Sequence, residues 1–166
     1  MPLNSFFCEK CSFDVGLDRL RTLVKNHASD VRFAFEFRHE SWFMEETCTT
    51  LRENNITMAW SEIFMVKTPP VLTTGNVCLR LVGDRSINEK DLGRIQKDRT
   101  PEIEKWSRRI QEAKHVLDHV FIFANNHFQG FGPGTVNLFR RSLVMDPVDW
   151  TIAMNRIVGE GQETLF

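Results

Sequence analysis

The chain has 166 residues, of which 42% are hydrophobic and 26% are charged, and its net charge is −1. This length and composition indicate one globular domain that is large enough to bury a core, and the near-zero charge excludes a global basic field that would attract nucleic acid, although a local basic face stays open. The sequence shows no apolar run that could span a bilayer and no leader, so we expect a cytoplasmic protein with no membrane partner and with reduced cysteines.

The sequence predicts helices that alternate with short strands. A helix is assigned where apolar residues recur at every third or fourth position, and a strand where they alternate or form a short apolar run. In chain order, the expected elements are a helix over 14–28, a strand over about 31–38, a helix over 42–54, a strand over 56–60, a strand over 77–83, a helix over about 100–117, a strand over 119–126, a helix opened by Pro133 and a helix over about 147–158.

Prolines and polar runs separate these elements. Two prolines exclude regular structure from residues 67–76, and residues 84–99 are expected to form a loop or a short helix. Thr100 is a suitable helix cap with Pro101 at the first helical position, and Ser41 is expected to cap the helix that follows it.

This order of elements argues for an α/β fold in which about four parallel strands alternate with helices. Four strands are few for such a domain, so two architectures stay open, a flat parallel sheet and part of a TIM-like barrel. Residues 1–158 are assigned to this single domain, and residues 159–166 to a flexible C-terminal tail.

Alternation gives each strand one bulky face, expected to pack on helices, and one face that is small or polar. The bulky residues are Phe33, Phe35 and Phe37, Met58 and Trp60, Val77, Leu79 and Leu81, and Phe121 and Phe123. The polar residues of the other faces lie toward the carboxyl ends of the strands, and they are Glu36, Arg38, Ser61, Arg80 and Asn126. A barrel whose interior opens into a site explains this pattern better than a sheet covered on both sides, which requires two apolar faces. The alternative is a structural ion pair between Glu36 and an arginine.

Three segments carry a resemblance to a known family. "FAFEFRHESWF", "VCLRLVGDRSI" and "FIFANNHFQGFGP" together resemble the DUF72 (YecE-like) family, whose members are similar to TIM barrels and whose function is uncharacterised. The matching positions are Glu36, Phe37, Arg38, His39, Ser41 and Trp42, then Arg80 and Gly83, then Asn125 and Asn126 with Gly130 and Pro133. Val82 departs from the pattern, because many members have a histidine there, and a role for that histidine cannot be transferred.

The resemblance covers the C-terminal half of the family pattern, and the Gly-rich first-strand motif is not seen. Two explanations stay open. The chain is either truncated or misannotated, or it is a half-barrel that must associate to cover its open strand edges, for example as a homo-oligomer.

The resemblance also implies a site at the carboxyl ends of the strands. In TIM barrels the loops after the last two strands often bind phosphate with the help of a helix amino terminus. The candidate ligand-binding residues are Arg80, Asp84, Arg85, Asn125, Asn126 and His127, and the candidate catalytic residues are Glu36, Arg38 and His39. The alternatives are that the glycines of the last loop only form a turn and that the histidines hydrogen-bond locally.

No metal site is predicted, and the cofactor stays unknown. Glu36, Glu62, His39 and His127 are potential ligands of a divalent metal, but no two of them have ligand spacing along a helix. The "CEKC" pair has no second CxxC to complete a zinc site.

The tail suggests a protein partner. Gln162, Leu165 and Phe166 resemble the Gln-x-x-Leu-Phe peptide that docks proteins onto sliding clamps, in which a flexible end offers two apolar side chains to a pocket. The alternative is a tail that folds back on the domain.

Three functions follow from these patterns. The first is the binding or hydrolysis of a phosphate-containing ligand or nucleic acid in the polar pocket. The second is a non-catalytic binding module that is tethered to a sliding clamp, and the third is an inactive fragment.

Overall fold

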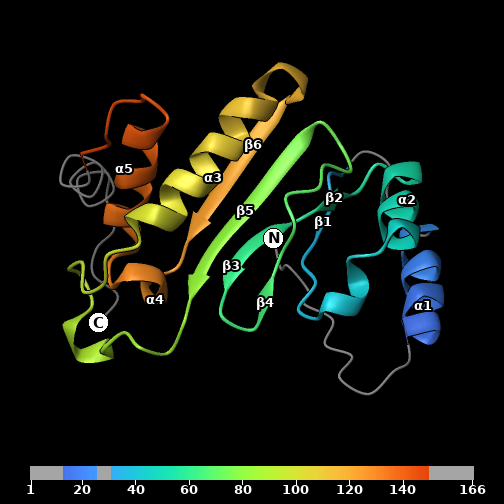
Figure 1. The fold of residues 1–166 in the computed structure, drawn as a ribbon, viewed down its shortest axis with the longest axis horizontal. Helices are drawn as coiled ribbons and strands as arrows, with labels where there is room; N and C mark the ends of the chain where they lie inside the picture. Colours follow the sequence, from blue (N-terminus) through green and yellow to red (C-terminus); the bar gives the residue numbers. More distant parts are fainter. Residues whose placement is uncertain (1–12, 26–30, 150–166) are drawn as a thin grey trace, which may run out of the picture.

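The computed structural model describes residues 13–25 and 31–149, and helices and parallel strands alternate along this part of the chain (Figure 1). The elements are α1 (Phe13–Lys25), β1 (Ala34–Phe35), the 3-10 helix η1 (Glu40–Trp42), α2 (Glu45–Glu53), β2 (Thr57–Met58), β3 (Trp60–Ile63), β4 (Val66–Lys67), β5 (Asn76–Gly83), η2 (Glu89–Asp91), α3 (Thr100–Ala113), η3 (Lys114–Val116), β6 (His119–Ala124), α4 (Asn126–Gln129) and α5 (Gly132–Ser142).

The four predicted strands are present and lie parallel. β1 pairs with β2, and the second sheet has the order β4-β3-β5-β6. The predicted second strand is interrupted at Ala59, so that its first part pairs with β1 and its second part, β3, pairs with β5. One row across the sheet joins Ser61, Arg80 and Phe123, and the adjacent row joins Trp60, Leu79 and Ile122.

A short antiparallel strand, β4, was not expected. It pairs with β3 through a two-residue turn at Phe64 and Met65, with Ile63 opposite Val66. No sequence pattern indicated this hairpin, because tight hairpin turns usually carry Asn-Gly or Asp-Gly rather than two large apolar residues.

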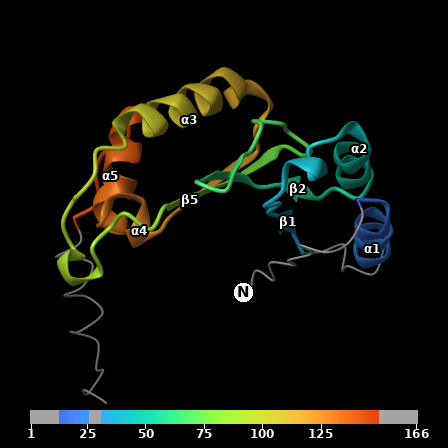
Figure 2. The same cartoon turned by 60° about the horizontal axis from the view of Figure 1, so that its bottom comes forward.

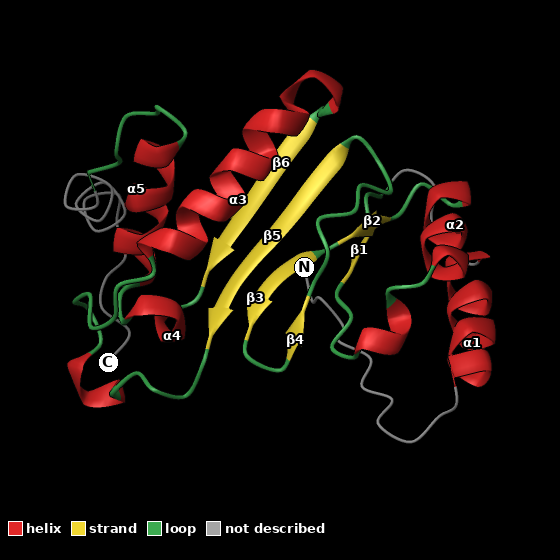
Figure 3. Cartoon of the chain, in the orientation of Figure 1, coloured by secondary structure: helices red, strands yellow, loops and turns green. Residues whose placement is uncertain are grey.

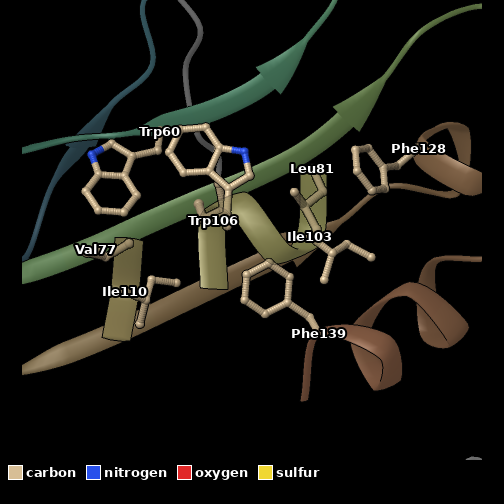
Figure 4. Packing of buried hydrophobic residues seen from close by; sticks show 9 residues of the cluster. Trp60, Val77, Leu81, Ile103, Trp106, Ile110, Phe128 and Phe139 are labelled. Carbon is tan, nitrogen blue, oxygen red and sulfur yellow. The ribbon is translucent and has the colours of Figure 1, made fainter. Parts of the chain in front are cut away.

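The helices cover one face of the larger sheet and one end of the molecule. α3 and α5 lie on the same side of β5, whereas α1 and α2 lie beside β1 and β2 (Figures 2 and 3). Trp60 and Trp106 stack with their ring centres 5.4 Å apart in the first core, which also contains the fully buried Phe128 and Phe139 (Figure 4). A second core, which includes Leu51 and Met58, joins α1 and α2 to the smaller sheet.

The bulky faces of the first three strands pack as predicted, but the assignment for the last strand is wrong. Ile122 and Ala124 pack against the core under α3 and α5. Phe121 and Phe123 therefore lie on the opposite face, where they are 40% and 50% exposed. The bulk of a side chain therefore identified the face that packs on the helices in the first three strands but not in β6.

The helix starts differ from the prediction in detail. Pro101 lies in the first turn of α3, but Thr100 is already helical, and its N–H donates to the Asp98 carboxylate at 2.9 Å. Ser41 does not cap the next helix, because it lies inside η1 and its backbone N–H donates to the His39 ring.

The predicted helix at the C-terminal end falls mostly outside the described residues. Residues 147–149 have no regular structure, and residues 150–158 are not described. No helix in the described part of the chain is both long and apolar enough to cross a membrane.

Candidate functional site

A buried carboxylate lies between two arginines at the end of β1. The side chain of Glu36 is 5% exposed, and Arg80 Nη1 donates to its Oε2 atom. The Nε atom of Arg38 lies 3.5 Å from Glu36 Oε1. Glu36 therefore forms the predicted ion pair with two arginines at once, and the structure brings together three of the predicted site residues.

The three side chains of this cluster, Glu36, Arg38 and Arg80, carry one negative and two positive charges. One carboxylate is shared by two guanidinium groups, whose side chains keep 25% and 27% of their surface exposed for Arg38 and Arg80. Each guanidinium has five N–H donors in a planar fork, which suits carboxylate and phosphate oxygens. The Arg80 guanidinium can therefore hold Glu36 and still offer N–H donors to a second anion.

Ser61 adds an unused polar group to this region. It is the strand neighbour of Arg80, on the same face of the sheet, and its side chain is 2% exposed. Among the residues that the structure describes, its Oγ atom has no hydrogen-bond partner, which is costly for a buried hydroxyl. Sequence alternation identified Ser61 as one of the polar positions toward the carboxyl ends of the strands, but its lack of a partner is visible only in three dimensions.

The His39 side chain is engaged locally. Its Nδ1 atom accepts the backbone N–H of Ser41 at 3.2 Å and lies 2.8 Å from the Ser41 hydroxyl. The ring thus closes the turn that begins η1, which is the local hydrogen bond given as the alternative to catalysis. Trp42 stacks on Phe37 at 4.9 Å and belongs to the edge of the second core.

The loop after β5 is organised around Asp84. Its carboxylate accepts hydrogen bonds from the Ser86 N–H at 2.9 Å, from Lys97 at 3.1 Å and from Arg99 at 2.5 Å. The hydrogen bonds from Ser86, followed by those from Lys97 and Arg99, hold the pKa of Asp84 well below its usual range. Asp84 therefore connects the end of β5 to the start of α3, and the neighbouring Arg85 is exposed.

The loop after β6 uses its polar side chains to start helices. Asn125 Oδ1 accepts the His127 N–H at 3.0 Å, and Asn126 Oδ1 accepts the Gly132 N–H at 2.8 Å at the beginning of α5. His127 Nε2 lies 3.2 Å from Glu89. These contacts match the alternative in which the glycine-rich segment forms a turn, and a ligand role for this loop stays a prediction.

Glu62 lies on the opposite face of the sheet from Arg80. It accepts hydrogen bonds from Trp106 Nε1 at 2.6 Å and from Lys105 Nζ at 2.5 Å, both on α3. It therefore does not join Glu36 as a metal ligand. Within residues 13–25 and 31–149, no three His, Cys, Asp or Glu side chains gather as metal ligands.

The two cysteines in the described part of the chain form no disulfide. Cys48 and Cys78 are buried free thiols, and burial raises the pKa of each. The CxxC pair, Cys8 and Cys11, and the clamp-like residues Gln162, Leu165 and Phe166 lie outside the described residues.

Comparison with known proteins identifies the fold. A family model described as "Protein of unknown function DUF72" matches residues 5–155. The chain belongs to the DUF72 family. A DUF72 family protein of Thermotoga maritima shares 21% identity with a TM-score of 0.64 over 86% of this chain. A DUF72 family protein of Enterococcus faecalis shares 20% identity with a TM-score of 0.61, again over 86% of the chain. No curated protein matches the chain.

The match is to part of each DUF72 structure. The chain covers 55% of the Thermotoga protein and 58% of the Enterococcus protein. The architecture is accordingly a partial TIM-barrel-like fold, in which the described strands do not close into a ring. At this level of identity the DUF72 structures establish the fold, and the chemistry of the arginine cluster must be argued from its own residues.

Proposed function

We propose that this protein binds a phosphate-containing ligand through Arg38 and Arg80. The observation that carries the proposal is the sharing of one nearly buried carboxylate, Glu36, by two partly exposed guanidinium groups. The excess positive charge favours a second anion, and Glu36 fixes the orientation of the guanidinium that it binds. Preorganised donors reduce the cost of ordering the site when a ligand arrives.

The location of the cluster supports the same proposal. Arg80 lies near the carboxyl end of β5, and in α/β folds of this kind ligands bind at the carboxyl ends of parallel strands. The Ser61 hydroxyl, beside Arg80, offers a further group that lacks a partner. Glu36 has a positioning role in this proposal, since accepting a proton would weaken both of its ion pairs. Hydrolysis of the ligand, nucleic acid as the ligand and tethering to a clamp stay predictions.

Thermal unfolding in inorganic phosphate tests the site. A ligand that binds only the folded state raises the melting temperature as its concentration rises. We expect phosphate to raise the melting temperature of the wild-type protein more than chloride does at equal ionic strength. Arg80→Gln and Arg38→Gln should each weaken phosphate binding by about 10-fold or more, because a charge-assisted hydrogen bond is lost.

Arg85→Gln is the matched control, since Arg85 is an exposed arginine of the loop after β5. We expect this variant to keep the phosphate effect. Loss of the effect in Arg85→Gln, with retention in Arg80→Gln, would move the anion site to the loop and overturn the proposal. A wild-type protein that responds equally to phosphate and chloride would overturn it as well.

A further inference from the structure

The face of the sheet opposite α3 and α5 carries exposed aromatic side chains on β6. Phe121 and Phe123 project from this face beside Cys78 and Arg80, their partners in strand register. Exposed phenylalanines at two successive positions on one face of a strand are unusual on a surface in contact with water, and they are typical of a surface that another element covers.

β6 also has a free edge. Within the described part of the chain, its only strand partner is β5. The Asn125 N–H donates to Leu81 O at 2.9 Å, and parallel pairing uses every second residue. The backbone N–H groups of Val120 and Ile122 therefore point away from β5, toward the unpaired edge. Such an edge is a template for a further strand.

The other end of the strand array is open in the same way. Among the described residues β1 pairs only with β2. The strands that link β1 to β6 pair in parallel at each step, so β1 and β6 run in the same direction. The array is curled, since the guanidinium of Arg32, just before β1, stands 5.7 Å from the centre of the Phe121 ring on β6. The two edge strands thus approach each other across one face of the sheet, as the strands of a barrel do.

We propose that a second copy of this chain covers this face, with β6 of each copy pairing in parallel with β1 of the other. Two such contacts related by a two-fold axis would close the array, and each copy would satisfy both free edges of its partner. The count of strands agrees, because the described residues of each copy contribute four parallel strands when the interrupted pair β2 and β3 is counted as one, and a TIM barrel contains eight.

Charge agrees with the same occupant, because a net charge of −1 on each chain gives little repulsion between copies. The proposal does not depend on the phosphate site, although closure would enclose Arg80 on the covered face.

The oligomeric state in solution tests this proposal. We expect sedimentation or light scattering to give twice the 19.4 kDa mass of the chain, with and without phosphate. Val120→Pro removes an outward-pointing N–H at a position where an edge strand tolerates proline, so this variant should be monomeric. Val120→Thr keeps both the N–H and the β-branched shape, and it should remain dimeric.

Hydrogen exchange gives a second measurement if Val120→Pro fails to fold. The amide of Ile122 should be protected in the concentrated wild-type protein and should exchange rapidly after dilution, whereas the amide of Asn125, bonded within one chain, should stay protected. A wild-type monomer at all concentrations would overturn the proposal. A dimer that persists in folded Val120→Pro, or an Ile122 amide that is indifferent to dilution, would also overturn it.

Discussion

At the scale of single residues, Gly83 shows how closely the end of β5 is packed. It has a φ of +84°, and a Cβ atom at this position would overlap the backbone of His127 and Phe128. Gly93 has a similar φ of +100° but open space around its Cβ direction. Substitutions at these two glycines therefore distinguish the cost of a left-handed backbone, which both share, from the cost of steric overlap, which arises only at Gly83.

We expect Gly83→Ala to lower the free energy of unfolding by about 3 kcal/mol or more, because it adds a clash with backbone to a strained φ. Gly93→Ala should cost about 1 kcal/mol, from the left-handed conformation alone. Urea denaturation of both variants measures the difference. If both variants lose the same free energy of unfolding, the backbone at the contact between β5 and α4 can move to accommodate the added methyl group.

Residues of the arginine cluster were predictable because the signal is local. Glu36 and Arg38 alternate with phenylalanines on one strand, and Arg80 alternates with leucines on another, so the period of two already places them on one face. The partners of Asp84 and Asn126 were not predictable, because Arg99 and Gly132 lie at the starts of α3 and α5, where no period relates them to the strands. Only the folded chain brings these loop groups together.

At the scale of elements, the side chain of Glu62 ties β3 to α3. Its carboxylate accepts the Trp106 indole N–H inside the first core and also pairs with the exposed Lys105. Removing the carboxylate would leave a buried donor without a partner, whereas removing the lysine would break only a surface ion pair.

We therefore expect Glu62→Leu to lower the free energy of unfolding by about 1–3 kcal/mol. Lys105→Met should cost less than about 1 kcal/mol, because exposed ion pairs contribute little. Glu62→Gln keeps an acceptor for Trp106 and should lie between the two. Chemical denaturation of the three variants gives the order, and an effect of Lys105→Met as large as that of Glu62→Leu would assign the stabilisation to the ion pair.

The parallel strands were predictable as elements, and their surroundings were less so. The apolar runs of β5 and β6 identify both strands, but the exposed face of β6 depends on its position at the edge of the sheet. A period of two gives the two faces of a strand without saying which one the helices cover. The hairpin of β3 and β4 was missed for a related reason, because pairing with β3 stabilises a turn that its own sequence does not favour.

At the scale of the whole molecule, the two cores are joined by the segment from Thr57 to Ile63. Met58 belongs to the second core and Trp60 to the first. The Thr73 hydroxyl accepts the Met58 N–H at 2.8 Å and donates to Ile56 O at 2.7 Å, so the loop before β5 is fixed to the strand beside it. A further bond runs from Trp60 Nε1 to Val71 O at 2.9 Å.

These bonds predict that the described domain unfolds as one unit. Leu51→Ala, in the fully buried part of the second core, should lower the free energy of unfolding by about 2–5 kcal/mol. If the cores are coupled, native-state hydrogen exchange should show the same loss of protection for amides in α2 and in β5, which lies in the first core. Leu92→Ala, at an exposed position, is the control and should change neither. If protection is lost only in α2, the two cores unfold independently, and the interruption of the strand at Ala59 separates them.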